Sequence, residues 1–295
     1  MRQDLELMYG GVDIHVHQGP DLYERIQDHN EVARAARTAG MRAICLKCHN
    51  FPTAQMALTT AKEVSGIDVF GSIVCNLQVG GVNPNAVEAA IKYGVRQIYL
   101  PTIDSTNHQK LTGVVGQHGT GLTIKGGLSD YTLKQPRIDL LDADGTLMPE
   151  VGVILDLVGQ ANVIFNFGHV AFEEMEAVIA EAKKHKVKKL VVDHPFFSKL
   201  DVQQQQTLAD HGVYVNYTAG ELLPRWWRVS IKDFAGAIRQ IGPERMVLSS
   251  DCGQLHNPPE VEGLRIVCQL LLEEGLDEAA IKRMFHTNPA DLLYE

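Results

Sequence analysis

Histidines and one aspartate recur at the ends of short apolar segments in this 295-residue sequence. His15 and His17 close the segment 11–17, and residues two apart on a strand point to the same face. His169, His194 and Asp251 each end another such segment. Neutral imidazole nitrogens and a carboxylate oxygen suit a borderline divalent ion and leave a position open for water. A single histidine of this kind is as often a structural core residue, so the predicted metal site depends on all five together.

The elements that must position these side chains alternate along the whole chain. Eight short segments rich in Val, Ile and Leu are mostly apolar on both faces, as in a parallel sheet covered on both sides. The expected strands are 11–17, 42–49, 68–76, 96–102, 162–169, 189–194, 213–218 and 246–251. The expected helices are 31–38, 52–64, 84–93, 150–158, 172–186, 202–210, 231–241, 260–274 and 277–286. Eight such units predict an α/β protein, a (β/α)8 TIM barrel with a single domain over residues 1–295.

The stretch 104–149 is the least regular part of the predicted barrel. It is polar, rich in glycine and too long for a plain connection, so we expect an inserted loop or short helices there. A doubly wound open sheet is the main alternative fold, but no glycine-rich dinucleotide fingerprint follows the first strand. In a TIM barrel the active site is built at the carboxyl ends of the strands, where the candidate ligands would gather.

The composition argues against several classes of function. The formal net charge is −9, and no run of Lys and Arg is denser than 183–189, so we expect no nucleic acid and no membrane as partner. Five cysteines are few and odd in number, which fits a reducing compartment. The N-terminus lacks a signal-peptide pattern, and no apolar run approaches about 18 residues. We therefore expect a cytoplasmic protein that acts on a small-molecule substrate.

The order of the candidate ligands resembles a known pattern. A His-x-His on strand one, a histidine on each of strands five and six, and an aspartate on strand eight resemble the ligand set of the amidohydrolase superfamily. The segments 242–245, 250–251 and 286–290 also resemble the ends of those chains. More narrowly, the chain is similar to an uncharacterised branch of metal-dependent hydrolases, through Lys-Cys-His at 47–49, Gly-Gly-Val-Asn-Pro at 80–84 and Leu-Pro-Thr at 100–102. The resemblance covers nearly the whole chain.

One departure from that superfamily concerns the number of metal ions. Binuclear members carry a carboxylated lysine or a glutamate at the end of strand four, whereas the segment 96–102 has neither. The site would then hold one divalent ion, or another residue would bridge two. Lys47 would bridge from strand two if CO₂ carboxylated it; the alternative is an ammonium group that binds substrate or forms a salt bridge. Zinc is the expected ion, with manganese or iron as alternatives.

The resemblance also implies roles for the ligands. His15, His17 and Asp251 would hold the first ion, and His169 would be shared or bind a second. His194 would ligate the second ion or polarise the scissile carbonyl. The ion would bring the pKa of its water toward neutrality, and Asp251 would accept the proton and pass it to the leaving group. An amide, cyclic amide, lactone or ester would suit this chemistry, so a metal-dependent hydrolase is the expected function.

Cationic residues form most of the predicted pocket. The candidate substrate contacts are His49, His108, Arg225 and Arg228, together with Lys47 and Lys199, and they favour a substrate that bears a carboxylate. Trp226 and Trp227 lie between the two arginines and would pack against a neighbouring helix or subunit, or form an anion-binding rim. The alternative functions are a metal-dependent non-oxidative decarboxylase of the same superfamily, a phosphoesterase and an inactive metal-binding barrel. By analogy with other barrel enzymes we expect a homo-oligomer.

Overall fold

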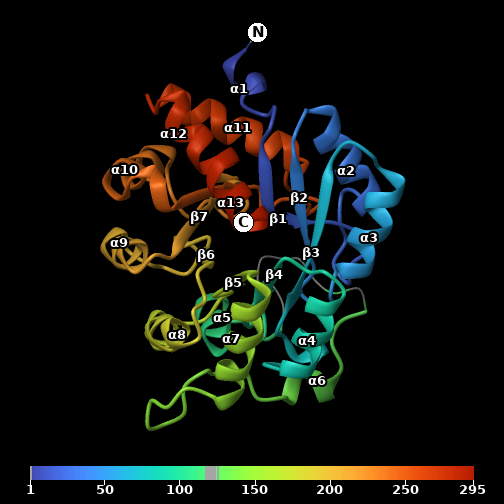
Figure 1. Ribbon diagram of the computed structural model, residues 1–295, viewed down its shortest axis with the longest axis vertical. Helices are drawn as coiled ribbons and strands as arrows, with labels where there is room; N and C mark the ends of the chain where they lie inside the picture. The colour runs from blue at the N-terminus through green and yellow to red at the C-terminus, as the bar shows by residue number, and fades with distance from the viewer. Residues whose placement is uncertain (1, 117–123, 125) are drawn as a thin grey trace.

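Eight parallel strands, neighbours in space in the order of the sequence, form the sheet of the computed structural model, which describes residues 2–116, 124 and 126–295 (Figure 1). The strands are β1 Val12–His17, β2 Ala43–Lys47, β3 Asp68–Val74, β4 Gln97–Tyr99, β5 Ile164–Asn166, β6 Leu190–Asp193, β7 Tyr214–Thr218 and β8 Met246–Ser249. The chain just after β8 returns to β1, because the Asp251 amide donates to the carbonyl of His15 and the His17 amide to that of Cys252. The sheet is thereby a nearly closed barrel, which confirms the predicted TIM barrel and excludes the open-sheet alternative.

Helices surround the barrel and connect the strands (Figure 1). The longer ones are α2 His29–Thr38, α3 Ala54–Glu63, α4 Pro84–Lys92, α7 Pro149–Ala161, α8 Phe172–Lys184, α9 Val202–Asp210, α10 Ile231–Ile241 and α11 Glu260–Glu273. Their starts follow local chemistry: the Asp28 side chain accepts from the amides of Asn30 and Glu31, each at 2.8 Å, and so caps α2. All eight correspond to predicted helices, within a few residues at each end.

Shorter elements include several that the sequence did not predict. They are α1 Gln3–Glu6, α5 Thr106–Thr112, α6 Asp130–Lys134, α12 Glu278–Lys282 and α13 Asn288–Tyr294, with η1 Leu77–Val79, η2 Ala219–Leu222, η3 Pro243–Arg245 and η4 Arg283–Thr287. The irregular stretch 104–149 contains α5 and α6, which agrees with the short helices expected there. The helix predicted at 277–286 is present as α12 and the π-helical segment η4, and α13 continues it to Tyr294, which the sequence did not predict.

The apolar residues form an inner and an outer layer. The inner layer fills the barrel near the amino ends of the strands, where Leu292 and Leu293 of α13 join inward side chains such as Val12, Ala43 and Cys45. The outer layer lies between the strands and the surrounding helices. Since apolar side chains fill the amino end, the polar side chains that point inward are concentrated at the carboxyl end.

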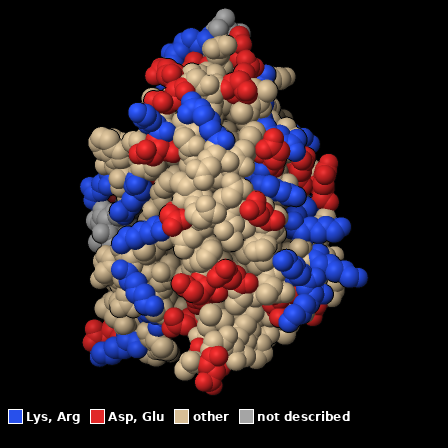
Figure 2. All heavy atoms as spheres, turned by 90° about the vertical axis from the view of Figure 1, so that its left-hand side faces the viewer, with Lys and Arg blue, Asp and Glu red and all other residues tan. Residues whose placement is uncertain are grey.

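The surface carries charges of both signs. Figure 2 shows the face over α8, α9 and α10, where Lys and Arg are interspersed with Asp and Glu. Within the part of the chain that the structure describes, no helix combines the length and apolar character needed to cross a bilayer.

Candidate metal centre and substrate cavity

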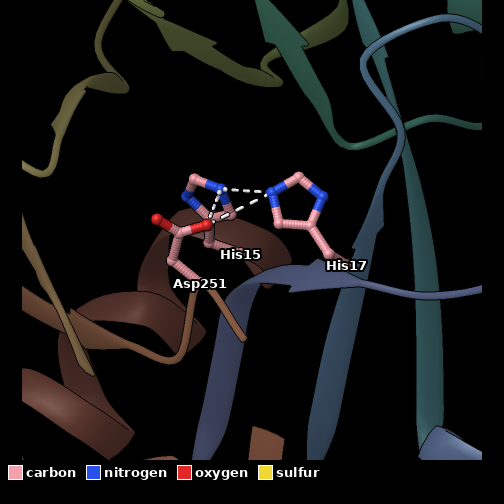
Figure 3. Close-up of side chains that lie close together, drawn as sticks. All are labelled: His15, His17 and Asp251. Atoms are coloured by element: carbon pink, nitrogen blue, oxygen red, sulfur yellow. Dashed lines mark hydrogen bonds and ion pairs between the residues drawn. The ribbon is translucent and has the colours of Figure 1, made fainter. Parts of the chain in front are cut away.

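The two histidines of β1 and the aspartate after β8 point toward one another (Figure 3). The Nε2 atoms of His15 and His17 are 3.3 Å apart, and the Oδ1 atom of Asp251 is 3.3 Å from the first and 3.2 Å from the second. All three residues are buried. The three atoms could therefore hold one metal ion together.

The chain leaves each later strand before it reaches the predicted ligand. The strands predicted at 162–169, 189–194 and 246–251 end instead at Asn166, Asp193 and Ser249. His194 and Asp251 follow with φ of +36° and +47°, a left-handed conformation that is strained for residues other than glycine. These turns direct the two side chains into the cavity, so they position functional groups and do not extend the strands.

Asp193 orients the ring of His15 from behind. Its Oδ2 atom lies 2.9 Å from Nδ1 of His15, and its Oδ1 atom accepts from the Asn216 side chain at 2.7 Å. Burial opposes ionisation of Asp193, but His15 and Lys47 outweigh it and hold the pKa of the carboxyl below its usual range. An ionised Asp193 fixes the His15 proton on Nδ1, which leaves the lone pair of Nε2 directed at the metal centre.

Arg25 contacts His17 at Nδ1, the same ring atom that Asp193 faces in His15. One guanidinium nitrogen lies 3.3 Å from Nδ1 of His17, and the guanidinium is paired with Asp21 at 2.6 and 2.8 Å. A guanidinium only donates, so Nδ1 of His17 accepts. Burial lowers the pKa of His17 well below its usual value, and this ring is neutral. A neutral ring that accepts at Nδ1 carries its proton on Nε2, which faces Asp251.

Lys47 ends β2 opposite His17 and reaches the same centre. Its Nζ atom lies 2.9 Å from Nε2 of His15 and 4.5 Å from the centre of the Tyr99 ring. The residue is buried, and burial lowers the pKa of its amine. The structure therefore brings Lys47 into direct contact with one of the predicted metal ligands.

Further imidazoles extend the centre across the barrel. The ring centres of His169 and His194 are 4.9 Å apart, that of His194 is 5.7 Å from His15, and that of His49 is 5.0 Å from His17. Burial lowers the pKa of His169 well below its usual value and that of His194 to about 3, so both rings are neutral. His15, Asp193 and His194 make a second group able to hold a metal ion.

The centre opens into a cavity of about 430 Å³. Its lining residues are His17, Lys47, His49, His169, His194, Phe197, Glu221, Trp226, Arg228 and Asp251. His15 lies beneath the lining, in contact with His17 and Lys47.

The predicted substrate contacts divide into two groups. His49 and Arg228 line the cavity, whereas His108, Arg225 and Lys199 do not. His108 is buried behind His169, with their Nδ1 atoms 2.7 Å apart, and Arg225 and Lys199 are exposed outside the lining. Their place in the fold therefore does not support direct contact with a substrate in this cavity.

Four residues of the site were not predicted from the sequence: Arg25, Asp193, Phe197 and Glu221. Asp193 directly precedes His194 at a strand end, and that position could have identified it. Phe197 and Glu221 carry no comparable signal, because Phe197 lies in the loop after β6 and Glu221 in the short helix η2 after β7. Glu221 is fully enclosed, and its carboxylate accepts from the amides of Phe197 at 3.0 Å and Thr218 at 3.4 Å. Burial raises the pKa of Glu221 to about 8.

Solved structures share this fold over nearly the whole chain. An amidohydrolase from Pseudomonas aeruginosa is 15% identical, with 99% of each chain covered and a TM-score of 0.62. The probable dipeptidase PvdM from the same organism is 11% identical, covers 98% of this chain and 96% of its own, and has a TM-score of 0.67. A lactonase from Listeria monocytogenes is 15% identical, with 97% and 95% covered and a TM-score of 0.58. The resemblance to amidohydrolases is thus confirmed at the level of the fold.

Comparison of the sequence itself identifies its family. No curated protein matches the chain. Residues 10–216, well over half of the chain, match the model of a family described only as a family of unknown function, DUF6282. The matched range begins just before β1 and ends within β7, so it contains the candidate ligands on β1 and those that follow β5 and β6. The chain therefore belongs to the DUF6282 family.

Proposed function

We propose that this protein is a metal-dependent hydrolase of the amidohydrolase type, which cleaves an amide, cyclic amide, lactone or ester of a small substrate. The observation that carries this proposal is the donor triangle of His15, His17 and Asp251, with sides of 3.2–3.3 Å. Ligand atoms about 2.0–2.1 Å from a tetrahedral ion lie about 3.3 Å apart, so the triangle fits one zinc-like ion. The amidohydrolase and lactonase that share the fold support the same reaction class.

The bound ion would supply Lewis acidity and a water of lowered pKa. Asp251 is placed to accept a proton from that water and to return it to the leaving group. Burial raises the pKa of Asp251. The resulting role is that of a proton carrier at the centre of the cavity.

His194 is placed to stabilise charge on the substrate carbonyl. It lines the cavity as a neutral imidazole, and its buried Nδ1 atom has no hydrogen-bond partner among the described residues. A neutral imidazole can donate one hydrogen bond to an oxygen that becomes negative in the transition state. If two ions bind, His169 and His194 would supply ligands for the second.

Two roles fit the position of Lys47. As a carboxylated bridge it would support two ions, and as an ammonium group it would face the substrate beside a single ion. The number of metal ions per chain separates these roles. A mononuclear decarboxylase is the second candidate function, because β4 presents no anionic ligand at its carboxyl end. Thr102 lies there instead, with its hydroxyl 2.8 Å from Nδ1 of His49.

The test is elemental analysis of protein purified without chelator or affinity nickel, followed by assays on ester, lactone and amide panels. Two ions per chain with hydrolysis would support the Lys47 bridge, and one ion with hydrolysis would support the ammonium role. CO₂ release without consumption of water would favour the decarboxylase. No bound metal, with no gain in thermal stability on addition of zinc or manganese, would contradict the metal centre. A cytoplasmic location and a homo-oligomer stay predictions of the sequence.

A further inference from the structure

The outer wall of the cavity comes from two loops, one after β6 and one after β7. Phe197 lies in the first, and Trp226 and Arg228 lie in the second. None of these three side chains has chemistry that a metal-dependent hydrolysis requires. The two aromatic rings instead provide flat apolar surfaces, and the arginine provides a cation. Such groups are suited to recognise a substrate.

Glu221 holds this wall in place from behind. Its carboxylate accepts from the amide of Phe197 at 3.0 Å, and its own carbonyl accepts from the amide of Arg228 at 2.7 Å. One buried residue therefore fixes the backbone on both sides of the wall. Because both loops are hydrogen-bonded to Glu221, this residue fixes the positions of Phe197 and Arg228 relative to each other.

Gly220 makes room for the Trp226 ring. A Cβ atom at position 220 would lie 2.7 Å from that ring and 3.3 Å from the carbonyl oxygen of Asp251. Any larger residue at this position would displace the indole. Because Gly220 has no side chain, the Trp226 indole can pack close to the backbone of Asp251. One face of a substrate would rest against this indole.

Arg228 provides a cation at the mouth of the cavity. Its guanidinium carbon lies 5.6 Å from the centre of the Phe197 ring, and the residue is exposed. Within the described ranges, no Asp or Glu forms an ion pair with it, whereas the deeper Arg25 is paired with Asp21. An unpaired guanidinium beside an aromatic ring is suited to bind a planar carboxylate.

We propose that the substrate carries a flat, aromatic-like group that packs against Phe197 and Trp226, and a carboxylate that binds Arg228. The reacting bond then lies on the opposite side of that group, toward Asp251 and His194. This inference rests on the proposed function for the bond that is cleaved. The binding preference itself rests only on the wall, so it can be measured without turnover.

The two tryptophans of the chain make binding directly observable, because Trp226 lines the cavity and Trp227 is 70% exposed. In the Trp227→Phe variant the fluorescence of Trp226 alone reports on the site. Benzoate, benzamide and acetate are titrated against this protein as purified. We expect benzoate to bind about tenfold more tightly than either benzamide, which lacks the charge, or acetate, which lacks the ring.

The second variant adds Arg228→Met to Trp227→Phe, and its matched control adds Lys232→Met, which removes an exposed charge outside the cavity lining. We expect the preference for benzoate over benzamide to disappear with the first and to persist with the second. Equal affinity for benzoate and benzamide in the parent, no binding at all, or a preference that survives Arg228→Met would overturn the proposal. A failed proposed function would appear separately, as absence of metal or of hydrolysis with the benzoate preference intact.

Discussion

The floor and the outer wall of the cavity are built in different ways. The floor consists of His15, His17 and Asp251, which lie on strands or directly after them and are buried. The wall consists of loop residues, and its cation, Arg228, is exposed. Barrel strands hold their side chains on a rigid scaffold, whereas loops vary without disturbing the barrel. The difference teaches that the proposed chemistry depends on the rigid floor, whereas the proposed substrate choice depends on the more variable wall.

Within the floor, His15 and His17 also differ. The Asp193 carboxylate faces Nδ1 of His15, keeps the proton there and leaves the Nε2 lone pair available, while Arg25 donates a hydrogen bond to Nδ1 of His17 and leaves the proton on Nε2. His15 is therefore already in the tautomer of a metal ligand, and His17 would have to carry its proton on Nδ1, the atom that faces Arg25, to ligate through Nε2.

The largest effect is expected from the substitution Asp251→Asn. An amide cannot accept the proton of the attacking water, so kcat on any ester or lactone found to be a substrate should fall by about a thousandfold or more. Steady-state kinetics with matched metal content measures this loss. Activity within about tenfold of the parent would show that Asp251 is not the proton carrier.

The second-largest effect is expected from removal of the metal ion, which should lower the thermal stability of the protein. An ion that binds only the folded state stabilises it by about 2.7 kcal/mol at a free concentration of 100 Kd. Chelation should therefore lower the thermal midpoint by several degrees, and zinc or manganese should restore it. Magnesium, which is harder and prefers oxygen ligands, serves as the control ion and should restore little.

Asp193→Asn should weaken metal binding without touching the cavity lining. The carboxylate that orients His15 is lost, and such partners typically contribute about 10–100-fold to metal affinity. Competition with a chromophoric chelator measures the zinc Kd. Asp156→Asn, which alters an exposed carboxylate paired with His185, is the matched control. Equal affinity in the two variants would remove Asp193 from the metal centre.

The smallest effect concerns the wall and appears as a pH dependence of stability. Burial raises the pKa of Glu221 from 4.5 to about 8, so the folded protein keeps this proton in a range where the unfolded chain has lost it. The native state then binds more protons, and the free energy of unfolding falls as pH rises between these values. Glu221→Gln should remove that fall.

Urea unfolding of the parent and of Glu221→Gln at several pH values between about 5 and 8 measures the difference. The variant should gain stability relative to the parent as pH rises. Parallel curves for the two proteins would mean that Glu221 is ionised in the folded state. Metal content should be the same in both, since Glu221 belongs to the wall and not to the floor.

The sequence by itself determined the barrel and the floor. Alternating apolar strands and helices are local patterns, and the carboxyl ends of barrel strands meet at one rim. The sequence therefore predicts that His15, His17, His169, His194 and Asp251 lie near one another. The predicted ends of β5, β6 and β8 ran too far, because the residues after them stay buried although the strand has ended. Buried residues after a strand look like part of it in the sequence, so the predicted strands were too long.

Only the tertiary structure decided the wall and the supporting contacts. Arg225 and Arg228 are alike in the sequence, yet one lines the cavity and the other does not. The choice depends on hydrogen bonds between separate loops, such as that from Phe197 to Glu221, 24 residues later. Asp193 and Arg25 likewise act on the two histidines through space. Such contacts leave no periodic signal, because the fold, and not the spacing along the chain, brings the residues together.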